Sequence, residues 1–174
     1  MENLTLGSLF DDSGGFPLGG LLAGVTPVWA SEVEPFAVRV TTKRLPFMKA
    51  NTIVNGTNPG YQNGLIDTDY TVRRLTPVEC ARLQGFPDWW CYGLDEPYPA
   101  IQDVRYWKEV WDTYARVIGG CKPKTEKQVR KWLEHPHSDA AEYKLWGNGV
   151  ALPCVYFVLA GIAYFAFTSD SEMK

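Results

Sequence analysis

The chain has 174 residues, 45% of them hydrophobic and 14% aromatic, so it is long enough to bury one core and short for two domains. Its formal net charge of −3 and its pI of about 5.4 exclude a global attraction to nucleic acid. A local basic face stays open, because residues 122–131 carry five bases and one acid whereas residues 1–38 carry no Lys or Arg. Any contact with phosphate is therefore expected from the later half of the chain.

Two strand and helix pairs are predicted to open the chain. A buried strand at 4–10 leads to a helix at 15–24, and a second strand at 27–33 leads to a helix at 35–44. Residues 46–69 are rich in Asn, Gly and Thr with little periodicity, which predicts a loop or irregular strands.

The later half is predicted to be mainly helical. The alternation at 70–76 predicts a strand, and Pro77 stands at the first position of a helix predicted over 76–86. An aromatic turn, PDWWCY, follows. Further helices are predicted at 101–118, at 125–134 and from about 150 onward. The helical spacing of Trp107 and Trp111 is typical of core residues.

The segment 150–167 has 18 residues without a charge, which is the length of a membrane-spanning helix. The alternative is a helix buried on most of its faces within an α/β core. We favour the buried helix, because Pro153 and Gly161 interrupt the run and no Lys or Arg flanks it closely.

The four cysteines are scattered, with no CxxC pair and no neighbouring His cluster, so neither a zinc site nor a disulfide framework is expected: Cys80, Cys91, Cys121 and Cys154. This usage indicates a reducing compartment. No basic leader precedes an apolar run at the N-terminus, so we expect no signal peptide and a cytoplasmic protein.

The sequence FDDSGG at 10–15 has the pattern of a ligand-binding turn. A strand that stops at a glycine-rich turn and feeds a helix presents backbone N–H groups to a ligand. An acidic residue that ends the second strand can bind ribose hydroxyls, and Glu32 stands at that place.

Three stretches together resemble signature motifs of DNA cytosine-C5 methyltransferases: SLFDDSGGFPLGG (8–20), RRLTPVECARLQGFPDWW (73–90) and GNGVALP (147–153). The resemblance covers roughly residues 4–46 and 70–167. It implies a single α/β domain, a reduced Rossmann-like methyltransferase fold that depends on S-adenosylmethionine, with a short, mostly parallel sheet and extra helices. Within residues 1–174, we expect a cofactor-binding-like half at 4–46, an irregular loop at 47–69, and the later motifs with a closing helix at 70–174.

The resemblance also implies which residues would bind S-adenosylmethionine. Phe10 would stack on the adenine, Glu32 would bind the ribose and Val33 would pack near the base. The remaining residues would line the methionine end or close the other side of the site: Ser13, Gly14, Gly15, Asn148, Gly149 and Val150.

The catalytic middle of that family is missing from the sequence. The family attacks C6 of a flipped cytosine with a cysteine in a Pro-Cys loop, uses a glutamate from Glu-Asn-Val, and anchors the base with a Gln-x-Arg-x-Arg strand. The only Pro-Cys pair here, Pro153-Cys154, lies in the last motif, where we expect the thiol to face packing. In addition, Asp12 replaces the usual glycine and brings a charge close to the ligand's carboxylate.

Two classes of function follow. The first is a truncated, catalytically inactive methyltransferase homologue, or one part of a split enzyme whose missing motifs lie on a complementary methyltransferase chain, with S-adenosylmethionine bound weakly. The second is a DNA- or protein-binding module without cofactor. The basic run at 122–131 is expected to be a solvated face, with contact to DNA phosphate as the alternative, and neither a membrane nor a metal is expected.

Overall fold

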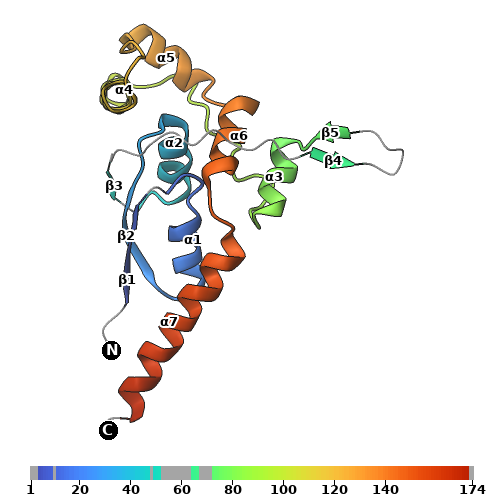
Figure 1. Ribbon diagram of the computed structural model, residues 1–174. Helices are drawn as coiled ribbons and strands as arrows, with labels where there is room; N and C mark the ends of the chain where they lie inside the picture. The colour runs from blue at the N-terminus through green and yellow to red at the C-terminus, as the bar shows by residue number, and fades with distance from the viewer. Residues whose placement is uncertain (1–3, 10, 48, 52–63, 67–71, 173–174) are drawn as a thin grey trace.

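The computed structural model describes residues 4–9, 11–47, 49–51, 64–66 and 72–172, and the chain forms a mixed α/β fold (Figure 1). Its main sheet has three parallel strands in the order β1-β2-β3. These strands are β1 (Thr5–Leu9), β2 (Thr26–Ser31) and β3 (Lys49–Asn51). The predicted short parallel sheet is therefore confirmed, and the fold is compatible with a Rossmann-like methyltransferase.

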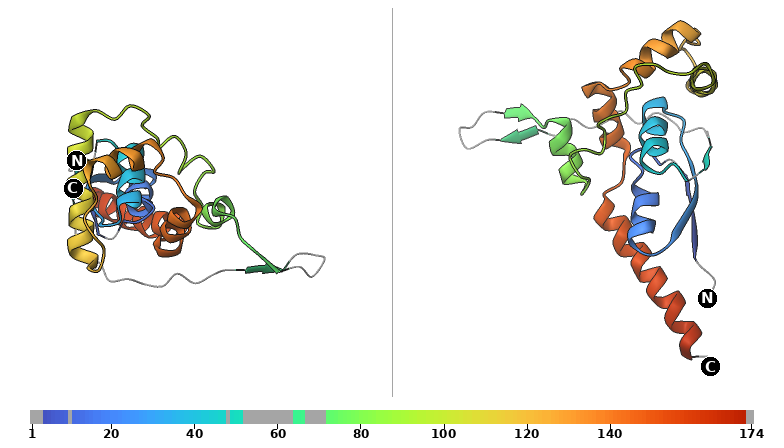
Figure 2. Two further views of the ribbon diagram at one scale, coloured as in Figure 1. Left: turned by 90° about the horizontal axis from the view of Figure 1, so that it is seen from above. Right: turned by 180° about the vertical axis from the view of Figure 1, so that it is seen from behind.

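Two helices cover one face of this sheet. The helix α1 (Gly15–Leu22) packs on β1 and β2, and α2 (Pro35–Arg44) packs on β3. Figures 1 and 2 show both helices on the same side. Among the described elements, none contacts the opposite face. The prediction that residues 4–10 form a buried strand is wrong for this reason: Thr5, Gly7 and Leu9 are exposed, and of the strand residues only Ser8 is buried.

A small antiparallel ribbon lies apart from the main sheet. It consists of β4 (Gly64–Ile66) and β5 (Val72–Arg74), and Figure 1 shows it projecting from the body next to α3 (Pro77–Leu83). The helix α3 begins with a capping box, in which the Glu79 N–H donates to Thr76 Oγ1 and the Thr76 N–H donates to Glu79 Oε2. The predicted strand at 70–76 and helix at 76–86 are thus confirmed within the described residues.

Three more helices form the later half: α4 (Ile101–Ile118), α5 (Glu126–Glu134) and α6 (Asp139–Asn148). The first two were predicted, whereas α6 was missed. Its signal was Ser138, whose hydroxyl accepts from the Ala141 N–H and caps the helix. The helices α4 and α5 bury an apolar cluster that includes Trp107, which confirms the prediction that this tryptophan is core. Trp111 is only partly buried and packs against the cluster.

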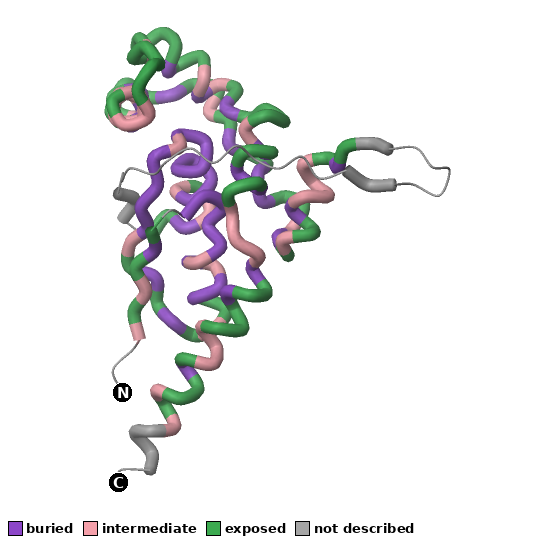
Figure 3. The backbone as a smooth tube through the Cα atoms, in the orientation of Figure 1, coloured by how far each residue is buried: buried purple, intermediate pink, exposed green. Residues whose placement is uncertain are grey.

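The last helix, α7 (Leu152–Glu172), was predicted from about residue 150, but it is less buried than predicted. Its first half packs on α1, with Val155 in contact with Gly19. Its second half continues past the sheet, and Figure 3 shows much of it exposed. Phe157 and Phe165 are 79% and 69% exposed, so the expectation of a helix buried on most faces is wrong. By length and apolar composition the helical stretch Asp139–Thr168, which includes most of α7, meets the criterion for crossing a membrane, a test that core helices also pass.

Candidate functional site

The turn between β1 and α1 is built from two residues with positive φ. Asp12 has φ 40° and Gly14 has φ 81°, a region that most side chains avoid but aspartate and glycine tolerate. The Gly14 N–H donates to the Asp11 carbonyl oxygen at 2.8 Å, which closes the turn. The helix α1 then starts at Gly15 with no side-chain cap, so its first N–H groups face the turn.

Glu32, at the end of β2, holds this turn in place. Its Oε2 accepts from the Asp12 N–H at 3.0 Å. Its Oε1 accepts from the N–H groups of Val33 at 2.6 Å and Glu34 at 2.9 Å. The carboxylate therefore ties two neighbouring strand ends together and keeps lone-pair capacity on Oε2 for one more donor.

Asp11 connects the turn to β1 and to α2 through hydrogen bonds of its buried carboxylate. It is 1% exposed and accepts hydrogen bonds from Ser8 Oγ at 2.9 Å and Thr41 Oγ1 at 3.3 Å. Burial outweighs these hydrogen bonds and raises the pKa of Asp11 to about 6. This anchoring role was not predicted from the sequence, because the partner Thr41 lies on a different helix.

Asp12 is the most perturbed acid of the site. Burial first, and then the charges of Glu32 and Asp11, raise the pKa of Asp12 to about 7, while a hydrogen bond from the Asn148 side chain acts in the opposite direction. Near neutral pH this carboxyl group therefore exchanges between charged and neutral forms. The hydrogen bond also links the turn to the last residue of α6.

The segment 148–150 closes the other side of the turn. A Cβ on Gly149 would lie 2.6 Å from Ser13 Oγ, and a Cβ on Gly15 would lie 2.9 Å from Val150 Cγ2. Larger residues would therefore force the two segments apart. The Leu152 N–H donates to the Gln84 carbonyl oxygen at 2.9 Å, which fixes the segment against the end of α3.

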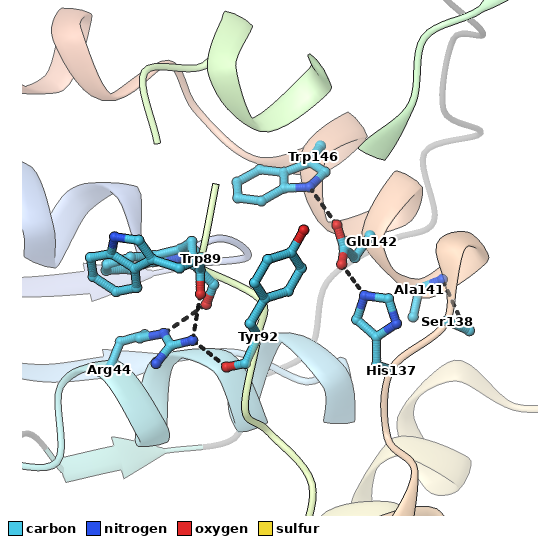
Figure 4. Close-up of polar contacts among 9 residues, drawn as sticks. Arg44, Trp89, Tyr92, His137, Ser138, Ala141, Glu142 and Trp146 are labelled. Atoms are coloured by element: carbon cyan, nitrogen blue, oxygen red, sulfur yellow. Dashed lines mark hydrogen bonds and ion pairs between the residues drawn. The ribbon is translucent and has the colours of Figure 1, made fainter. Parts of the chain in front are cut away.

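Trp90 supports the turn from the third side. Its Nε1 donates to the Ser13 carbonyl oxygen at 2.8 Å, and its ring packs in the main core beside Phe86. Arg44 in turn donates to the carbonyl oxygens of Trp89, Trp90 and Tyr92 (Figure 4). The sequence indicated an aromatic turn here but not its contact with Ser13.

A buried carboxylate also orders α6. Glu142 is 3% exposed and lies between His137 Nε2 and Trp146 Nε1, which donates to it at 3.3 Å (Figure 4). Trp146 belongs to the same core as Trp90. The helix that leads into residues 148–150 is thereby fixed in orientation.

Three buried polar atoms around the site have no hydrogen-bond partner among the described residues: Ser13 Oγ, Ser31 Oγ and Gln84 Oε1. Unpaired buried hydroxyls and amides cost stability. Such groups are typical of sites where a polar ligand or a water molecule supplies the missing hydrogen bonds.

The structure brings most of the residues expected at the cofactor site together. Ser13, Gly14 and Gly15 form the turn, Glu32 holds it, and residues 148–150 pack against it. Val33 is buried and follows Glu32 directly. Phe10 lies outside the described residues.

The cysteines differ in exposure. Cys154 is exposed, so the expectation that its thiol faces packing is wrong; the packed seam of α7 runs through Val155 instead. Cys91 is 2% exposed, and burial raises the pKa of its thiol well above the usual range. In the part of the chain that the structure describes, no group of three or more His, Cys, Asp or Glu side chains could hold a metal ion.

These features define a mixed α/β protein with a glycine-rich turn after the first strand and an acidic residue at the end of the second. The model of the C-5 cytosine-specific DNA methylase family matches residues 41–103, roughly a third of the chain. The match confirms the family resemblance over that segment and is consistent with a truncated member of the cytosine-C5 methyltransferase family. Searches among curated proteins and solved structures gave no significant match.

Proposed function

We propose that this chain is the cofactor-binding part of a DNA cytosine-C5 methyltransferase, and that it does not methylate DNA on its own. One observation carries the proposal: the β1–α1 turn, Glu32 and residues 148–150 meet around buried hydroxyls that lack partners. The family to which residues 41–103 are similar uses S-adenosylmethionine, so that ligand is the one we propose.

The residues present fit this ligand in part. The free acceptor capacity of Glu32 Oε2 suits a ribose hydroxyl, and Val33 supplies apolar surface beside it. The unpaired Ser13 hydroxyl and the first N–H groups of α1 suit the carboxylate of the methionine part. When bound, S-adenosylmethionine supplies an electrophilic methyl group.

The chain lacks the residues that would use that methyl group. Its sequence has no Glu-Asn-Val, no Gln-x-Arg-x-Arg and only one Pro-Cys pair, which belongs to the last motif. Removing groups that act as a unit abolishes nearly all chemical acceleration. We therefore expect no transfer of tritiated methyl groups to mixed-sequence DNA above a control without enzyme.

Asp12 weakens the proposed binding. A carboxylate pair near a partly exposed site costs on the order of 1 kcal/mol, and a lost hydrogen bond from a charged group adds roughly 1.5–3 kcal/mol. The family's adenine-binding aspartate is also missing from the sequence. Together these differences lower the affinity by about two to three orders of magnitude relative to a complete site.

Calorimetric titration with S-adenosylmethionine and S-adenosylhomocysteine tests the proposal. We expect weak binding that Asp12→Gly strengthens about tenfold, equivalent to about 1.4 kcal/mol, and that Glu32→Ala abolishes. The exposed Asp95→Gly is the matched control and leaves the affinity unchanged. If Asp12→Gly folds and still binds neither ligand, the cofactor proposal is wrong.

The alternative, a DNA-binding module without cofactor, is favoured by one surface. The basic side chains of 122–131 are largely exposed around α5, although Lys124 Nζ lies 4.3 Å from the centre of the Trp111 ring. Binding to duplex DNA that weakens steeply with salt, and that the double variant Lys127→Ala/Lys131→Ala reduces, would support this function. Salt-independent binding or no binding would exclude it.

A further inference from the structure

The β1–α1 turn brings three buried carboxyl groups together. Asp11 is 1% exposed, Asp12 is 9% exposed and Glu32 is 8% exposed, and the Asp12 N–H donates to Glu32 Oε2 at 3.0 Å. The charges that act on Asp12 are those of Glu32, Asp11 and Glu34, all of them carboxylates. Buried carboxylates are normally paired with a cation, because taking a charge out of water is costly. A positive charge at this turn would therefore stabilise it.

The segments on either side of the turn carry no basic residue. Residues 1–38 contain no Lys or Arg, and residues 149–173 contain none either. The bases of α2 and α6 have other partners or are exposed: Arg39 pairs with Glu96, Arg44 donates to the carbonyl oxygens of Trp89 and Trp90, Lys144 pairs with Glu34, and Lys43 is exposed. A counter-charge for the turn is therefore expected from the ligand.

Asp12 is the acid of the three that is best able to meet a ligand. Both oxygens of Asp11 accept hydrogen bonds from hydroxyl groups, and Glu32 accepts from three backbone N–H groups. Asp12 receives a hydrogen bond from the Asn148 side chain. A carboxylate has about four acceptor positions, so Asp12 keeps capacity for a positively charged group.

The two ligands considered for this site differ by one charge. S-adenosylmethionine carries a sulfonium cation in addition to its ammonium and carboxylate groups. S-adenosylhomocysteine has an uncharged thioether in place of the sulfonium. Near buried carboxylates, one unit of charge is enough to separate the affinities of two ligands that are otherwise alike.

We propose that the acidic turn selects its ligand by charge, and that it binds S-adenosylmethionine in preference to S-adenosylhomocysteine because the additional cation is the counter-charge of Asp12 and Glu32. This inference rests on the proposed function. The repulsion between Asp12 and the ligand's carboxylate acts on both ligands alike, so it lowers both affinities and leaves the difference between them. A site of this kind retains the methyl donor and releases the demethylated product.

Calorimetric titration of the full 174-residue chain with each ligand at pH 7.0 measures the preference. We expect the Kd of S-adenosylhomocysteine to exceed that of S-adenosylmethionine by about tenfold. Asp12→Asn keeps the size of the side chain and removes its charge, so it should reduce this ratio to about threefold or less. Asp95→Asn, at an exposed site, is the matched control and leaves the ratio unchanged.

Proton release is a second readout, which needs no variant. Asp12 is surrounded by Asp11 in the turn, Glu32 at the end of β2, Glu34 before α2 and Asn148 on α6, and burial together with these carboxylates raises the pKa of Asp12 to about 7. A positive charge nearby favours the ionised carboxylate and lowers this pKa. At pH 6.5, binding of S-adenosylmethionine should therefore release more protons than binding of S-adenosylhomocysteine, which titrations in buffers of different ionisation enthalpy measure.

The outcomes separate this proposal from the cofactor proposal. Equal affinities for the two ligands, a ratio that folded Asp12→Asn leaves unchanged, or equal proton release with both ligands would each overturn selection by charge, and the cofactor proposal would stand. If neither the chain nor folded Asp12→Gly binds either ligand, the cofactor proposal itself is wrong, and selection by charge is wrong with it. Thermal unfolding of each variant checks the fold.

Discussion

Two neighbouring regions of the core are built in opposite ways. The β1–α1 turn combines positive φ at Asp12, two acids with raised pKa values and a buried hydroxyl without a described partner. The segment 75–94, which supports it, has a capping box at α3, a two-bonded Arg82–Asp88 pair and the fully buried Leu94. The second region is ordered by a helix cap and a buried core, whereas the first contains strained and buried polar groups that cost stability.

The support segment should give the largest effect. Trp90→Ala removes a buried ring and its hydrogen bond to Ser13, so we expect the free energy of unfolding to fall by about 3–5 kcal/mol in urea titration. The adjacent Trp89 is 54% exposed, and Trp89→Ala is the control with a much smaller loss. Equal losses for the two variants would show that the segment does not support the turn.

The turn should make stability depend on pH. The pKa of Asp12 is raised to about 7 in the folded chain and is near 3.8 when unfolded, so between these values the folded state binds more protons. Stability therefore falls as pH rises, by about 2–3 kcal/mol between pH 5 and pH 8.

Chemical unfolding at several pH values checks this dependence. Asp12→Asn keeps the size of the side chain and should remove most of the fall above pH 6, whereas part of the fall below pH 6 persists because burial also raises the pKa of Asp11 to about 6. Asp95→Asn at an exposed site should leave the profile unchanged. A profile that stays as steep in Asp12→Asn would contradict the assignment.

Glu32 links the two strand ends, and its replacement should have an intermediate effect. Glu32→Gln leaves one carbonyl oxygen for three N–H donors, so we expect a loss of about 1–3 kcal/mol in unfolding free energy. Glu34→Gln serves as control, because Glu34 has a more exposed ion pair with Lys144 whose loss costs less. A larger loss for Glu34→Gln than for Glu32→Gln would show that Glu32 is not the residue that links the two strand ends.

The smallest effect is expected at the helix cap of the support segment. Thr76→Ala removes the side-chain acceptor of the capping box and should cost about 1 kcal/mol by thermal or urea unfolding. Thr5→Ala, on the exposed face of β1, should cost nearly nothing. No measurable loss at Thr76 would mean that the cap contributes little to the segment.

The sequence predicted elements well where the signal is local. Capping residues and periodicity predicted α2, α3, α4 and α5. The signature stretches predicted that Glu32 and residues 148–150 lie around the same turn, and the structure places them there. Apart from the missed helix α6, the errors concern burial. Periodicity cannot show that one sheet face is uncovered, nor that α7 extends past α1, because both depend on which other elements are present. The contacts of Trp90 and Asp11 were missed since their partners are distant in sequence.

The contacts around the turn also determine when the site can form during folding. Gly15 meets Val150 and Gly19 meets Val155, pairs separated by more than a hundred residues along the chain. Contacts between residues so far apart in the sequence form slowly, because a large loop must close before they are made. The ribosome must therefore release the chain beyond Val155 before the β1–α1 turn acquires its second wall, and until then the apolar strands are open to aggregation.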